Sequence, residues 1–241
     1  MILANVRQCL TRGDAQFAVR LIARGSSSEL DVLEHTLRDE GLDAILDDPR
    51  LRAALLEQSH AAHASIRLFT YVVVRHALRE VGEGDRGLAD LVAAVLLHFG
   101  ARDRARRIRE YDDQVYDTLA SLLADAECSD PTRAFLVRAH LGNYALWLAG
   151  IFPDYIEARR HRRGGPDLEY FDEMGRRGYE LAAAHRLAAQ HGVQPLFAHA
   201  AERFGRLRFA LNRVSDGIFF ARHHSASKLM RQVRDEARWV A

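Results

Sequence analysis

Hydrophobic residues recur every three or four positions along nearly the whole chain, with polar or charged residues between them. This period is typical of amphipathic α-helices, whereas a half-buried strand would alternate at every second residue. Ser28 with Asp31 predicts the start of one helix and Gly41 its end, and Pro49 and Asp85 predict the starts of later helices. The pattern therefore predicts an all-α protein, a compact multi-helix bundle of about eight to ten helices.

Residues 66–74, I-R-L-F-T-Y-V-V-V, are compatible with either a helix or a strand. Their β-branched and aromatic residues favour a strand. However, Ile66, Phe69, Val73 and Ala77 share one helical face, and a lone strand would have no partner to pair with. We therefore expect a buried helix, reached from a preceding helix that begins at Pro49 and continues towards Ile66.

The second half of the chain predicts longer helices. Asp130 and Pro131 form a strong start signal, because aspartate accepts free N–H groups of the first turn and proline has none to satisfy. Pro153 interrupts this helix, which restarts over residues 154–163. A charged helix is expected after Gly100, with Ile108, Tyr111, Val115, Leu119 and Leu122 inward. Further helices are expected over residues 168–191, 196–214 and 227–240.

We expect residues 1–225 to form a single all-α domain and residues 226–241 to form a C-terminal amphipathic helix. Leu229, Val233, Ala237 and Val240 make a narrow apolar stripe on this helix. An isolated helix of this length is marginal in water, so it must lie on something. The surface that it packs on could belong to a partner protein, to a second copy of the chain or to the body of its own domain.

Composition limits the function classes. The 241 residues are 48% hydrophobic and 28% charged, which is an ordinary balance for a globular protein. The formal net charge is only +1, so any binding of an anion must be local. Cys9 and Cys128 stand alone, which argues against a zinc site or a disulfide framework. No apolar run suits a signal peptide or a membrane span, and we expect a cytoplasmic protein.

Enzyme-like motifs are weak. Glu57, His60 and His63 follow one another at intervals of three in an expected helix, and two of them could hold a metal. The E-x-x-H order resembles that of di-iron bundle proteins, but the second motif that those sites need is absent. Polar surface residues are the simpler interpretation. Nucleophile elbows, P-loops and dinucleotide motifs are absent too, and we expect no cofactor.

The densest basic run lies in residues 159–163, R-R-H-R-R, before Gly164 and Gly165. Cations at the end of a helix complement its dipole, which is the structural explanation. The functional alternative is a site for a phosphate or an acidic surface, because guanidinium groups bind both. Aromatic residues flank the run and could stack on a base. The candidate binding residues are Trp147, Tyr155, Arg159, Arg160, Arg162, Arg163 and Tyr170.

Three segments also resemble a group of bacterial hypothetical proteins from high-GC genomes. They are L-F-T-Y-V-V-V-R-H-A-L from Leu68, D-R-G-L-A-D-L-V-A-A-V-L-L-H-F from Asp85, and residues 140–179. The likeness runs from about Arg50 to Phe220. It implies a bacterial cytosolic helical protein and no particular activity.

Taken together, the sequence predicts a non-enzymatic cytoplasmic protein that acts by binding another macromolecule. A protein partner or self-association is the leading hypothesis. The first alternative is binding of nucleic acid or a phosphate anion through residues 159–163. The second is a metal-dependent helical enzyme that uses Glu57, His60 and His63.

Overall fold

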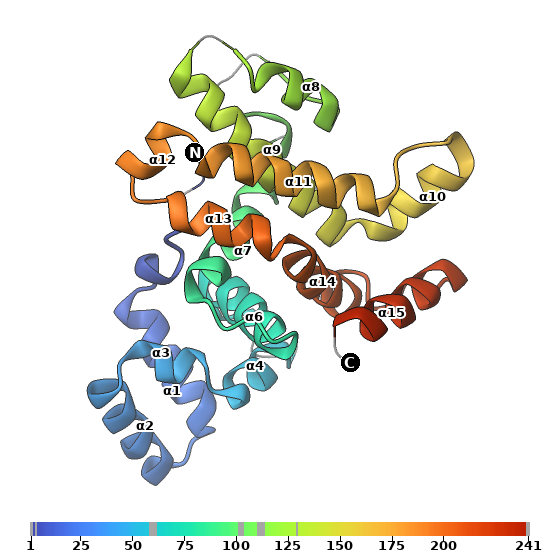
Figure 1. Ribbon diagram of the computed structural model, residues 1–241. Helices are drawn as coiled ribbons and strands as arrows, with labels where there is room; N and C mark the ends of the chain where they lie inside the picture. The colour runs from blue at the N-terminus through green and yellow to red at the C-terminus, as the bar shows by residue number, and fades with distance from the viewer. Residues whose placement is uncertain are drawn as a thin grey trace.

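The computed structural model describes residues 2, 4–57, 62–100, 104–109, 114–128 and 130–239. All regular structure in these residues is helical, and no strand occurs among them (Figure 1). The all-α prediction is therefore confirmed, but these residues form 14 α-helices instead of eight to ten. No helix in the described ranges is both long and apolar enough to cross a membrane.

The N-terminal part consists of short helices at the lower left of Figure 1. After a 3-10 turn (Arg7–Cys9) they are α1 (Arg12–Ala23), α2 (Ser27–Asp39), α3 (Leu42–Leu46) and α4 (Pro49–Leu56). The cap of α2 is Ser26, whose hydroxyl accepts the Glu29 N–H, and not Ser28 as predicted. Gly41, with φ 85°, separates α2 from α3. The start of α4 at Pro49 is confirmed.

Residues 66–74 are helical, as expected, within α6 (Ile66–Glu80). The Ser65 hydroxyl accepts the Leu68 N–H and so caps the helix. The preceding helix does not continue through Glu57, where the backbone is extended with ψ 123°. Residues 58–61 lie outside the described residues. Asp85 caps α7 (Arg86–Phe99), and Gly100 follows its last turn, as predicted.

The charged helix that was expected after Gly100, with Ile108 to Leu122 inward, is not present as one helix in the described part of that segment. A 3-10 turn (Arg104–Arg106) and the short α8 (Leu119–Asp125) stand in its place. Ile108, Leu119 and Leu122 are buried, as expected, but Val115 is exposed. Tyr111 lies outside the described residues. The helical spacing of the apolar residues therefore predicted the burial of these three side chains correctly, although no continuous helix forms in the described residues.

Two further segments expected as single helices are divided. The first is split into α11 (Leu168–Ala183) and α12 (Arg186–Gln190). Between them His185 is extended, with ψ 137°, and its ring nitrogen accepts the Leu187 N–H as a new cap. The second is split into α13 (Gln194–Glu202) and α14 (Phe204–Val214) at Arg203, whose ψ is 8°. Neither break contains proline or glycine.

The long helix α9 (Pro131–Ile151) packs against α11 so closely that their backbones touch. A Cβ atom added to Gly178 would lie 2.5 Å from the backbone nitrogen of Gly142. Directly beside this contact, the buried Tyr179 hydroxyl donates to Oδ1 of Asn143 at 2.8 Å. Only glycine permits such an approach, so Gly142 and Gly178 fix the position of α11 on α9.

Pro153 ends α9 and begins α10 (Pro153–Arg163). Because proline has no N–H, the Ala149 carbonyl has no donor in its own helix. The Asn212 side chain of α14 donates to the carbonyls of Ala149 and Gly150, both at 2.8 Å. The Ser215 hydroxyl donates to the Ile151 carbonyl at 2.7 Å. The break in α9 thus holds the end of α14 and the π-helical turn (Ser215–Phe219) that follows it.

The last element is α15 (Ala226–Trp239). It packs against α14 and α10, and with α10 it forms an arm that projects from the body at the right of Figure 1. We call α10 and α15 the C-terminal arm. The proposed division of the chain at residue 226 stays a prediction.

The glycine contact generates a prediction for stability. Replacing Gly178 by alanine should lower the free energy of unfolding by about 1–3 kcal/mol, because the new methyl group meets backbone atoms that cannot move aside. Gly84→Ala is the matched control, since a Cβ atom there would meet nothing within 4 Å. Urea unfolding measures both. Equal stability of Gly178→Ala and the natural protein would show that the helices separate at little cost.

Candidate functional site

The C-terminal helix attaches to the rest of the protein through its charged side. Lys228, Arg231 and Asp235 lie at intervals of three and four, which places them on one face of α15. All three are buried, and the Arg231 side chain is only 2% exposed. An amphipathic helix normally buries its apolar side. In α15 the arrangement is reversed.

The partners of the buried Arg231 come from two other elements. Arg231 binds both carboxylate oxygens of Asp216 in the π-helical turn, at 2.9 and 3.1 Å, and Asp154 of α10 at 3.2 Å. Asp216 also accepts from the Gln232 amide at 3.0 Å. A buried charge is tolerated only when it is paired and hydrogen-bonded, and Arg231 meets both conditions.

Lys228, the only lysine in the chain, fills a site that suits a compact three-donor cation. Its ammonium group donates to the carbonyls of Phe220 and His223 at 3.1 and 3.0 Å. It also lies 3.4 Å from Oδ1 of Asp216. An ammonium group has three N–H donors arranged around one nitrogen, whereas a planar guanidinium group donates only within one plane.

A second buried ion cluster links α15 to α14 and α11. Arg208 of α14 contacts Asp172 of α11 at 2.9 Å and Asp235 of α15 at 3.5 Å. The same guanidinium donates to Oδ1 of Asn212 at 2.7 Å. Burial raises the pKa of the Asp172 carboxyl above its ordinary value, although the Arg208 charge acts in the opposite direction. The cluster therefore joins the α9 break to α15 through Asn212 and Arg208.

The opposite face of α15 is apolar and points away from the protein. Leu229, Met230 and Val233 are 61%, 68% and 58% exposed. Ala237 is also exposed, whereas Val240 lies outside the described residues. Leu229, Met230 and Val233 are called the α15 stripe below. The predicted stripe exists, but α15 lies on its own chain through the other face.

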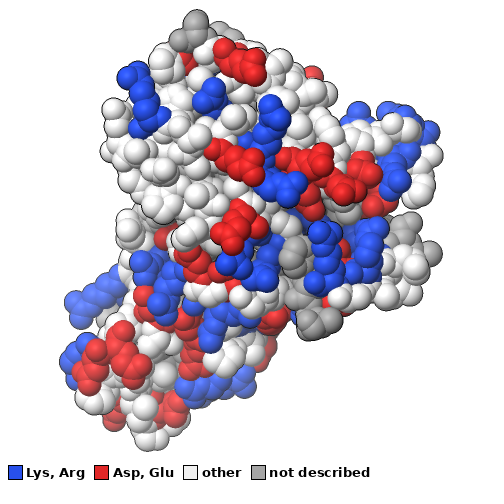
Figure 2. Space-filling model, viewed as in Figure 1, with Lys and Arg blue, Asp and Glu red and all other residues white. Residues whose placement is uncertain are grey.

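The basic run lies at the free end of α10. Arg159, Arg160, Arg162 and Arg163 are all exposed, and within the described residues none of them pairs with a carboxylate. Figure 2 shows Lys and Arg side chains gathered over the end of α10 and over α15 on this face. Tyr155, on the same helix, is 63% exposed. The structure thus brings Tyr155 and the basic run together on one exposed helix.

Trp147 and Tyr170 lie elsewhere. The Trp147 ring is half-buried, stacks on Tyr144 at 6.3 Å between centroids and meets Phe152 edge-on. Tyr170 is half-buried on α11, edge-on to Phe171. Both rings pack against the hydrophobic core and are not part of the exposed surface of α10.

The two described candidates for metal ligation, Glu57 and His63, do not lie on one helix. Glu57 follows the end of α4, and its carboxylate pairs with Arg24 at 2.8 Å. His63 is exposed in a turn, and His60 lies outside the described residues. The helix that was expected to carry all three ends before Glu57. In the described part of the chain, no three histidine, cysteine or acidic residues are placed to hold a metal.

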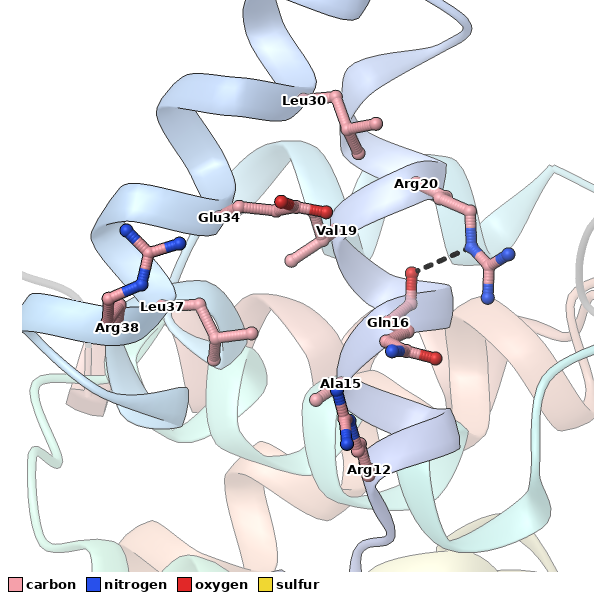
Figure 3. A pocket seen from close by; sticks show the side chains of 9 residues that line it. All are labelled: Arg12, Ala15, Gln16, Val19, Arg20, Leu30, Glu34, Leu37 and Arg38. Atoms are coloured by element: carbon pink, nitrogen blue, oxygen red, sulfur yellow. Dashed lines mark hydrogen bonds between the residues drawn. The ribbon is translucent and has the colours of Figure 1, made fainter.

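A hollow of about 500 Å³ lies between α1 and α2 (Figure 3). Leu30 and Leu37 of α2 point towards α1, and Val19 forms part of its floor. Charged side chains occur at its open rim, where the Arg20 guanidinium donates to the Gln16 carbonyl of its own helix. The hollow is a groove between two packed helices, and no polar groups converge in it.

Sequence reasoning missed the ion clusters. It considered only the apolar stripe of the last helix. One signal was available, because Lys228, Arg231 and Asp235 recur with the same helical period as the apolar stripe. That period predicts two faces on α15 but does not say which one is buried.

The Lys228 site generates a prediction. Lys228→Arg keeps the charge but cannot place donors on both carbonyls and Asp216, so the free energy of unfolding should fall by about 1–3 kcal/mol. Amide hydrogen exchange in α15 should accelerate. Arg222→Lys, at an exposed position, is the control and should change neither quantity. Unchanged exchange in Lys228→Arg would show that α15 is held without this ammonium group.

Comparison of the chain with models of protein families, with curated proteins and with solved structures found no match.

Proposed function

We propose that this protein acts by binding another protein through the α15 stripe. One observation carries the proposal: α15 is held by its ionised face and leaves its apolar face outside. Removing charges from water is costly, and the alternative of burying Leu229, Met230 and Val233 would have been favourable. A helix that keeps this orientation presents its apolar side chains to something else. Contiguous exposed apolar surface is typical of protein-binding sites.

The charges beside the stripe define the partner. Arg234, one residue beyond Val233, is 61% exposed at the edge of the stripe, and its only ion-pair contact among the described residues is Glu157 at 3.8 Å. A segment that fits this surface carries apolar residues at helical spacing with carboxylates along one edge. We therefore assign the stripe to an acidic amphipathic helix of a partner protein.

A second copy of the chain suits the stripe less well. When two copies of α15 pack antiparallel about a two-fold axis, each edge faces its own counterpart. Arg234 would then face Arg234, and like charges across an interface are repulsive. An acidic partner replaces this repulsion by attraction.

The test replaces the stripe by Leu229→Ser, Met230→Ser and Val233→Ser in one variant. Proteins captured by the full chain from cells that express it naturally should decrease at least about ten-fold, because anchor side chains of an interface each contribute over 1 kcal/mol. Stability should change little, since all three side chains are exposed.

Val32→Ser is the matched control, because Val32 is 59% exposed and lies on α2, outside the C-terminal arm. The control should capture the same proteins as the natural chain. If the stripe variant also captures them all, the proposed function is wrong. If sedimentation shows a dimer that only the stripe variant loses, the occupant is a second copy and the acidic partner is wrong.

A further inference from the structure

The three sides of α10 have different surroundings. Ile156 is buried in a small apolar cluster with Ala149 and Leu168. Asp154 and Glu157 point to α15, where they contact Arg231 and Arg234. The remaining side contacts no other helix through its charges in the described residues. This outer side carries Tyr155 and two arginines.

Tyr155, Arg159 and Arg162 occupy positions i, i+4 and i+7, so they lie in one row along the outer side of α10. The row spans about 10 Å at the rise of an α-helix. All three side chains are exposed, and neither guanidinium pairs with a carboxylate in the part of the chain that the structure describes. The row therefore presents one aromatic face and two available planar cations in the same direction.

The helix dipole explains only part of this arrangement. Cations in the last turn of a helix are favoured, which accounts for Arg160, Arg162 and Arg163. Arg159 and Tyr155 precede that turn and gain little from it. The chain leaves the helix at Gly164, with φ 63°, and Gly165 lies against the side chain of Arg159. The turn thus passes beside Arg159 and leaves the outer row uncovered.

We propose that this row binds single-stranded nucleic acid, with a base stacked on Tyr155 and phosphates on Arg159 and Arg162. Guanidinium groups bind phosphate through paired N–H donors, and stacking on an aromatic ring requires an unpaired base. A single strand would use both kinds of side chain in the row, whereas the carboxylates of an acidic protein would use the arginines alone. The site is separate from the α15 stripe, so it does not depend on the proposed function.

The experiment is a titration of the full chain against a fluorescein-labelled oligouridylate of about 12 nucleotides, followed by anisotropy. Tyr155→Ala should weaken binding by roughly 5- to 150-fold, which corresponds to the loss of one stacked base. Tyr155→Phe should restore it, because the ring is retained. Arg159→Gln with Arg162→Gln should reduce the slope of log K against log salt by about 1.4, since two phosphate contacts are lost.

The control variant carries Arg12→Gln and Arg20→Gln on α1, which removes the same charge from two other exposed arginines. It should bind like the natural chain. An equal loss in this variant would show general electrostatic attraction, and the proposal would fail. It would also fail if a duplex of the same length binds as tightly with no effect of Tyr155→Ala. Tighter binding of polyglutamate than of the oligonucleotide would assign the row to an acidic protein.

Thermal unfolding of each variant completes the test. The five exposed side chains exchanged on α10 and α1 make no ion pairs in the described residues, so the melting temperatures should agree with that of the natural chain. A large decrease for the α10 arginine variant alone would show a structural role and overturn the binding site.

Discussion

The missing N–H of Pro153 determines how the C-terminal arm is built. It ends α9 and leaves the Ala149 carbonyl without a donor in a buried position. A buried carbonyl must be hydrogen-bonded, and the donor is the side chain of Asn212. This bond fixes the end of α14, and the π-helical turn after it places Asp216 where Arg231 and Lys228 meet it. The attachment of α15 therefore depends on a break in another helix.

The same network explains why α15 buries its charged face and exposes its apolar face. Arg208 contacts Asn212, Asp172 and Asp235, so the donor that satisfies α9 is itself held by a cation that needs carboxylates. Buried ion clusters are weak evidence for stability, because desolvation offsets much of the attraction. They do impose geometry, since each charge requires its partner in one place. We interpret the clusters as the device that fixes which face of α15 is exposed.

The sequence predicted the elements whose signals are local. Asp130 with Pro131, Pro49 and Asp85 each supply a cap or a fixed φ within the same turn, and each start was found. The breaks at His185 and Arg203 carry no proline or glycine, and tertiary packing decides them. The orientation of α15 depends on Asp154, which is 77 residues from Arg231, and on Asp216 in the turn before α15. The periodic pattern within the helix has no information about either carboxylate.

Arginines of the arm differ in role because of where carboxylates lie and not because of residue type. Arg231 is fixed by Asp154 and Asp216, whereas Arg159 and Arg162 on the outer side of α10 have no carboxylate opposite them in the described residues. The ion pairs between α10 and α15 hold the two helices together, so the outer row and the α15 stripe are presented by one joined unit. A ligand of one surface would consequently lie beside the ligand of the other, although each surface is formed by different side chains.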